Sequence, residues 1–283
     1  MEKYGIEQVP LSERTTGTRS LIVLWIGFAV IASVFLTGSL ATGVGHWFGA
    51  VSAIVFGTLI MALYMGCGAW MGAEQGLPGS VISRTAFGTR GNLFASIPMW
   101  VGCFGWVGVQ IAILSFAVQG LLNAYLPDVV ISIPVLYIVF GILMAVFAVY
   151  GYQYVVKFEF IAVSLMVLLM LIIVGVLFAE YGAAAMTRPY TTDIPMAWGA
   201  AANLTPAASI ALFMAAADTS RYARSRKTAL WTCMVTSFVA FCIVSILGIF
   251  SAIVAGTWDP VRVMANMGLT AIGLPFLILA SWT

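Results

Sequence analysis

Charged residues are scarce in this sequence. Only 8% of its 283 residues are Asp, Glu, Lys or Arg and 62% are hydrophobic, whereas soluble domains carry roughly a quarter charged residues. Together with a mean hydropathy of +1.07, this excludes a soluble globular domain and indicates an integral membrane protein. Long charge-free runs separated by short polar breaks favour a helical bundle over a β-barrel, whose strands would be about ten residues long with alternating character.

Residues that build metal centres and hydrolytic triads are almost absent. The sequence has one histidine, His46, and its four cysteines form neither a CxxC pair nor a zinc-type spacing with that histidine. No pair of acids lies inside an apolar run, so an integral membrane enzyme is disfavoured and no cofactor is expected. The net charge of +2 is spread without a basic stripe or nucleic-acid motif, which predicts no nucleic-acid partner.

The sequence is instead rich in long apolar runs. Seven are complete, and an eighth begins near Met267 and is still running at Thr283. A spanning helix needs about 20 residues, so the eighth is barely long enough, and we expect the sequence to be a C-terminally truncated fragment. The complete runs cover Leu21–Gly43, Trp47–Met71, Leu93–Leu122, Val130–Tyr150, Phe160–Phe178, Ala197–Ala217 and Leu230–Gly256.

The distribution of basic residues predicts the orientation in the membrane. With the N-terminus in the cytoplasm, ten Lys and Arg residues fall inside, and only Arg188 and Arg262 fall outside. This positive-inside bias supports a multi-pass protein of the plasma membrane, typical of a bacterial inner membrane, with a cytoplasmic N-terminus. The inside residues are Lys3, Arg14, Arg19, Arg84, Arg90, Lys157, Arg221, Arg224, Arg226 and Lys227.

The first and sixth runs contain residues that interrupt helices. The first is rich in glycine and small polar residues, including Gly27 and Gly38, and the sixth has Pro206 near its middle. Broken backbone at membrane depth is tolerated where it lines a cavity or is buried in protein. Interrupted helices at equivalent positions of two halves favour a transporter with a substrate and ion site near the midplane. A simple kink at Pro206 and close helix packing at the glycines remain alternatives.

Trp106 and Gln110 are the most informative pair of residues. They lie in a run without charge between Arg90 and Asp128, and their spacing of four places them on one helix face. Lipid offers a glutamine amide no partner, so Gln110 faces a cavity, a neighbouring helix or a ligand. An indole face beside an amide that both donates and accepts suits a planar polar heterocycle. The alternatives are a packing aromatic and an interhelical hydrogen bond.

Five segments together resemble the nucleobase:cation symporter family, which includes cytosine, purine, uracil, allantoin and hydantoin permeases. The resemblance covers nearly the whole chain with the segments in the right order. They are Val9–Thr15 before the membrane, Gly76–Gly91 between helices two and three, Gly105–Gln110 in helix three, Ala217–Arg224 leaving helix six, and Ala280–Thr283 at the start of the helix-eight motif.

The resemblance implies an all-α polytopic membrane protein with an inverted five-helix-repeat transporter fold, in which helices one to seven and most of helix eight are present. Residues 1–19 would form a cytoplasmic N-terminal segment. Residues 20–180 would form the first repeat, and residues 181–283 would form an incomplete second repeat with helices six to eight. A monomer is expected.

The resemblance also implies a substrate site. Trp106 matches the stacking tryptophan of the family, and Gln110 matches its hydrogen-bonding glutamine. Ser209 stands where relatives carry a second aromatic residue that sandwiches the base. Phe213, one turn further along, is the expected substitute.

The resemblance further implies a coupling ion, sodium or a proton. For sodium, the carbonyls of Gly27 and Val30 on helix one, the carbonyl of Ala280 and the hydroxyl of Thr283 on helix eight match the family's ligands. Asp218 is the acid closest to a span, and we interpret it as a structural acid that caps or pairs locally at a cytoplasmic helix end rather than a proton carrier.

The sequence therefore predicts a secondary active transporter that imports a nucleobase or a related planar cyclic amide by cation symport and alternating access. A channel or receptor is the alternative class, although channels usually build rings of charges or filter carbonyls in oligomers. A membrane enzyme is the least favoured class.

Overall fold

The computed structural model describes residues 4–150, 152–188, 190 and 194–282, and this part of the chain is helical with no assigned strand. An isolated parallel bridge joins Thr16 to Ala223. The elements are η1 Leu11–Glu13, α1 Thr18–Ala29, α2 Ala32–Ala41, η2 Thr42–Val44, α3 Trp47–Gln75, α4 Gly79–Tyr125, α5 Ile133–Tyr150, α6 Tyr152–Val176, η3 Leu177–Tyr181, η4 Ala183–Thr187, α7 Trp198–Ala208, α8 Leu212–Ser220, α9 Arg226–Ala255, α10 Pro260–Asn266 and α11 Thr270–Trp282.

Every predicted apolar run is occupied by helix. Within the described residues, five spans are long and apolar enough to cross a membrane, and α1 with α2 adds a sixth that is bent by 55°. Shorter apolar helices cover Ile133–Val146 and Thr270–Ser281. Helices one to eight of the sequence analysis are thus α1 with α2, α3, α4, α5, α6, α7 with α8, α9 and α11.

The segment expected to be a loop between helices two and three is largely helical. α4 begins already at Gly79, whose backbone N–H donates to the Asp218 carboxylate on α8 at 2.6 Å. Gly88 interrupts the helix with φ 69° and ψ 173°, a conformation open to glycine because it has no Cβ. The short α10 between helices seven and eight was not expected either.

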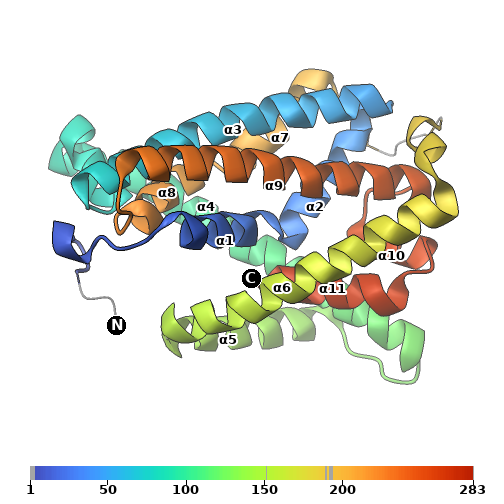
Figure 1. The fold of residues 1–283 in the computed structure, drawn as a ribbon. Helices are drawn as coiled ribbons and strands as arrows, with labels where there is room; N and C mark the ends of the chain where they lie inside the picture. Colours follow the sequence, from blue (N-terminus) through green and yellow to red (C-terminus); the bar gives the residue numbers. More distant parts are fainter. Residues whose placement is uncertain (1–3, 151, 189, 191–193, 283) are drawn as a thin grey trace.

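The helices pack as two groups (Figure 1). In one group, α3 packs on α7, α8 and α9, and α9 also packs on α1 and α2; in the other, α11 packs on α4 and α6, and α5 packs on α4. Each group takes helices from both sides of residue 180. The predicted repeats at 20–180 and 181–283 therefore describe chain order, and their boundary stays a prediction.

Glycines bring the helices of the first group into backbone contact. A Cβ at Gly57 on α3 would clash with the Ala202 carbonyl oxygen on α7, and a Cβ at Gly68 would clash with the Phe213 carbonyl oxygen on α8. Gly38 on α2 meets the backbone of Ser245 on α9 in the same way. Close packing, one of the two interpretations of the helix-one glycines, is therefore confirmed for Gly38.

Candidate functional site

Helix one is interrupted where its composition predicted. α1 ends at Ala29, Val30 follows with φ −85° and ψ 60°, and Ile31 is extended with φ −123° and ψ 153° before α2 begins. The Val30 N–H still donates to the Ile26 carbonyl at 2.9 Å. The carbonyls after Ile26 therefore belong to the last turn of α1, where helices leave acceptors unsatisfied and carry partial negative charge. Gly27 and Val30 both contribute carbonyls to this turn.

Helix six is also interrupted, slightly later than the proline suggested. Pro206 lies inside α7, which continues to Ala208. Ser209 then leaves the helix with φ −104° and ψ 10°, and α8 begins at Leu212. Ser209 is buried, with 5% of its surface exposed, and Phe213 is half-buried in the first turn of α8. The break thus places the two predicted helix-six residues at its two ends.

Two side chains bind backbone carbonyls at the end of α7. The Trp106 indole N–H on α4 donates to the Ala208 carbonyl at 2.5 Å. The Tyr64 hydroxyl on α3 donates to the Pro206 carbonyl at 2.9 Å. Trp106 therefore meets helix six directly, next to Ser209. Tyr64 was not predicted from the sequence, where its phenol hydroxyl inside the apolar run of helix two is the only signal.

Gln110 joins helix three to helix eight. Its side-chain N–H donates to the Ala280 carbonyl at 3.1 Å, so the interhelical hydrogen bond considered for this residue is present. The amide oxygen of Gln110 is buried and has no hydrogen-bond partner among the described residues. A buried amide acceptor without a partner is unfavourable by about 1–3 kcal/mol. Gln110 thus combines a structural donor with a free acceptor.

The predicted ion ligands are only partly described. Ala280 is fully buried, and its carbonyl is the acceptor for Gln110. The rings of Phe35 on α2 and Phe276 on α11 lie 6.3 Å apart, which brings the second half of helix one against helix eight. Thr283 lies outside the described residues. Across the described part of the chain, no group of three or more His, Cys, Asp or Glu residues could hold a metal ion.

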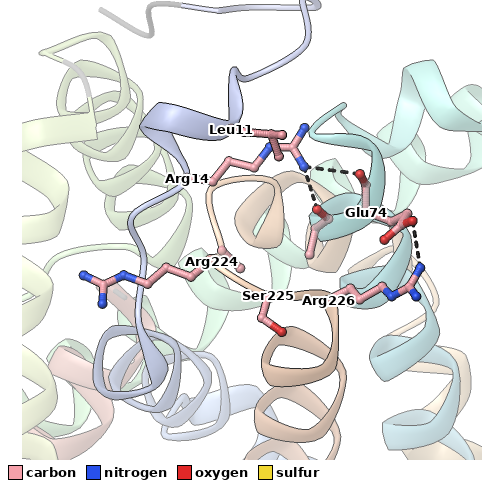
Figure 2. Close-up of a pocket in the computed structure, with 8 residues that line it drawn as sticks. Leu11, Arg14, Glu74, Arg224, Ser225 and Arg226 are labelled. Atoms are coloured by element: carbon pink, nitrogen blue, oxygen red, sulfur yellow. Dashed lines mark hydrogen bonds and ion pairs between the residues drawn. The ribbon is translucent and has the colours of Figure 1, made fainter.

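A cavity of about 400 Å³ lies at a different place, where the N-terminal segment crosses α3 and the start of α9 (Figure 2). Arg14 reaches over it and donates to the carbonyls of Ala73 and Glu74, while the Glu74 carboxylate pairs with Arg226 at 2.8 Å. In Figure 2 the Arg224 side chain points away from this cluster. None of the predicted substrate or ion residues lines the cavity.

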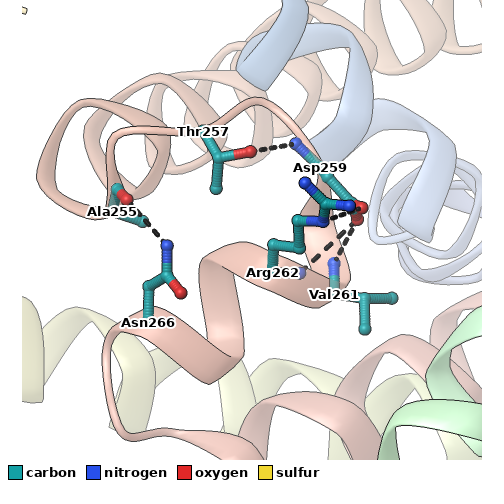
Figure 3. A network of polar contacts seen from close by, with 6 residues as sticks. All are labelled: Ala255, Thr257, Asp259, Val261, Arg262 and Asn266. Carbon is teal, nitrogen blue, oxygen red and sulfur yellow. Dashed lines mark hydrogen bonds and ion pairs between the residues drawn. The ribbon is translucent and has the colours of Figure 1, made fainter.

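The connection between α9 and α11 is held by a polar network (Figure 3). The Asp259 carboxylate accepts from the Val261 N–H at 2.9 Å and from the Arg262 N–H at 3.5 Å, which caps α10. The Asn266 amide donates to the Ala255 carbonyl at 3.0 Å. These contacts explain the local fold of this connection.

The fold defined by these helices is that of an inverted-repeat transporter. The structure superimposes on Mhp1, a nucleobase-cation-symport-1 family transporter in a closed conformation with bromovinylhydantoin bound, with a TM-score of 0.79 and 18% identity over 99% of this chain and 66% of that one. The inward-facing conformation of Mhp1 gives a TM-score of 0.75 and 18% identity over 100% of this chain and 65% of that one. The all-α inverted-repeat fold is thereby confirmed.

Residues 8–282 match the family described as permease for cytosine/purines, uracil, thiamine, allantoin, and the chain belongs to this family. It is 27% identical over 277 residues to the cytosine permease of Escherichia coli strain K12, which covers 97% of this chain and 64% of the permease. It is 31% identical over 101 residues to the purine-uracil permease NCS1 of Arabidopsis thaliana, covering 35% of this chain and 17% of that protein. The chain thus spans about two thirds of the cytosine permease.

Proposed function

We propose that this protein is a secondary active transporter that imports a nucleobase or a related planar cyclic amide. The observation that carries the proposal is the buried amide oxygen of Gln110, which has no hydrogen-bond partner among the described residues and lies one helical turn from the indole of Trp106. Family membership and the similarity to a cytosine permease support the substrate class.

Each residue then has a chemical task. The indole N–H of Trp106 is bonded to Ala208, so the group that Trp106 offers a base is its ring face. One N–H of the Gln110 amide is bonded to Ala280, and the amide oxygen is an acceptor for a ring N–H or amino group of the base. Ser209 and Phe213, on helix six, lie at the border of the site.

The coupling ion, sodium or a proton, binds to elements that adjoin the base site. For sodium, the carbonyls of Gly27, Val30 and Ala280 and the hydroxyl of Thr283 supply oxygen ligands, as unwound transporter helices do. The ion would stabilise the contact of helix one with helix eight and thereby pre-form the base site. Coupling requires that the base binds one of two conformations better, because a ligand with equal affinity for both shifts nothing. The protein acts in the plasma membrane with its N-terminus in the cytoplasm, as a monomer.

Uptake of labelled cytosine, uracil and hydantoin by cells that express the whole gene to which this sequence belongs tests the proposal. We expect saturable uptake of one compound that responds to a sodium gradient or to an uncoupler. Trp106→Ala should weaken binding by about 1–3 kcal/mol through lost stacking, which is roughly 5- to 150-fold in affinity.

Trp100→Ala is the matched control, because Trp100 lies on the same helix with 62% of its surface exposed. It should leave uptake unchanged. Uptake that does not saturate would favour a channel. An unchanged affinity in Trp106→Ala, in protein shown to be in the membrane, would remove Trp106 from the site.

A further inference from the structure

The break in helix six is held from two sides. Carbonyls in the last turn of a helix have no intrahelical partner, and at the end of α7 the carbonyls of Pro206 and Ala208 receive side-chain donors instead. Trp106 comes from α4, in the second helix group. Tyr64 comes from α3, in the group to which α7 and α8 themselves belong. Of these two side-chain bonds, the Tyr64 bond is therefore the one that joins the break to a helix of the same group.

Tyr64 also sits between two points where α3 touches helix six. Gly57, seven residues before Tyr64, lies against the Ala202 carbonyl of α7, and Gly68, four residues after it, lies against the Phe213 carbonyl of α8. At these points the backbones are in contact. Between them lies the break, which α3 reaches with the phenol of Tyr64. The Tyr64 hydroxyl thus links α3 to the end of α7 at the break itself.

We propose that Tyr64 is a positioning residue for the base site, and this rests on the proposed function. Its hydroxyl holds the end of α7, so that the Ala208 carbonyl stands where the Trp106 indole N–H meets it. That bond in turn orients the ring face offered to the base. Tyr64 acts on the base through Ala208 and Trp106.

The test compares Tyr64→Phe with the unaltered chain in detergent. Phenylalanine keeps the ring and removes only the donor to Pro206. We expect the dissociation constant for the compound bound best among cytosine, uracil and hydantoin to rise three- to tenfold. We also expect faster deuterium exchange at the amides of Ser209 and Leu212, which close the two sides of the break. Tyr125→Phe is the matched control, because Tyr125 ends α4 with 58% of its surface exposed.

A second variant separates positioning from general stability. If Tyr64 acts through the Trp106 bond, Tyr64→Phe should change the affinity much less in a Trp106→Phe background, where that bond is already lost. Two full and independent effects would overturn the proposed route through Trp106. An unchanged affinity in Tyr64→Phe, with or without a lower melting temperature, would overturn the positioning role.

The exchange measurement keeps this inference separate from the proposed function. If the unaltered chain binds none of the three compounds, the proposed substrate class fails. Exchange at Ser209 and Leu212 that is the same in Tyr64→Phe and Tyr125→Phe would show that Tyr64 does not hold the break, whatever the substrate is.

Discussion

At the scale of single residues, Arg14 makes several hydrogen bonds far from the proposed base site. It is buried, with 9% of its surface exposed, and it donates to the carbonyls of Val9, Ala73 and Glu74. These bonds fasten the N-terminal segment to the end of α3. The Thr16 bridge to Ala223 fastens the same segment to the turn before α9. The segment thereby ties together helices of the first group.

Arg14→Ala should therefore lower the stability of the whole chain. Hydrogen bonds from charged donors contribute about 1.5–3 kcal/mol, and their loss here leaves buried carbonyls without a donor. We expect a loss of about 2–3 kcal/mol in the free energy of unfolding, measured by thermal or denaturant unfolding in detergent. Arg262→Ala, at a side chain that is 77% exposed, should be nearly neutral. Equal losses in the two variants would contradict the fastening role of Arg14.

At the scale of secondary-structure elements, the proposed function depends on two interrupted helices, one in each half of the described chain. The interruption in helix six can be held in place because glycines let α3 approach α7 and α8 to backbone contact. A side chain on α3 at these points would push helix six away from Tyr64. The close packing at the glycines thus keeps the break in helix six within reach of Tyr64.

Gly57→Ala should separate α3 from α7. The added methyl would meet the Ala202 carbonyl oxygen, which belongs to the backbone and cannot rotate away. Overpacking of this kind destabilises by about 1–3 kcal/mol, and it should also weaken base binding because the break moves. Thermal unfolding and base affinity measure the two effects. Gly175→Ala on α6, where nothing lies within 4 Å of the added Cβ, is the control. A stability loss there as large as at Gly57 would contradict the explanation.

At the scale of the whole molecule, polar contacts between described residues join the two helix groups. One is the Trp106 bond to Ala208 near the break in helix six. Another is the Asp218 carboxylate of α8, which caps the first turn of α4 at Gly79. Asp218 accepts a hydrogen bond at a helix end, but the predicted local pairing is wrong, because its partner lies 139 residues away in the sequence. It joins the two groups at the end of the molecule where the N-terminal segment lies.

Asp218→Ala should let the two groups separate at this end. Loss of a capping side chain is worth about 1 kcal/mol, enough to shift a balanced equilibrium about fivefold. We expect faster labelling of a thiol introduced as Ser80→Cys, followed by peptide mass spectrometry so that Cys67 and Cys103 are read separately. Asp259→Ala removes a cap within the connection before α11 and should not change that labelling. The same rate in both variants would contradict the joining role of Asp218.

Much of this architecture was readable from the sequence because its causes are local. Scarce charge and apolar runs long enough to span a bilayer indicate a membrane helix bundle whatever the tertiary contacts are. The breaks in helices one and six were predicted from small residues and Pro206, whose effects act within one or two turns. Trp106 and Gln110 were selected from their spacing, and the family from five segments in order.

Only the tertiary structure decided which groups satisfy the broken backbone. Tyr64 and Pro206 are 142 residues apart, Trp106 and Ala208 are 102 apart, and Gln110 and Ala280 are 170 apart. The helical start of α4 at Gly79 likewise depends on Asp218 from another helix. An unsatisfied carbonyl specifies only that a donor is needed. Which donor arrives depends on how the two helix groups pack, and nothing local to either partner determines that.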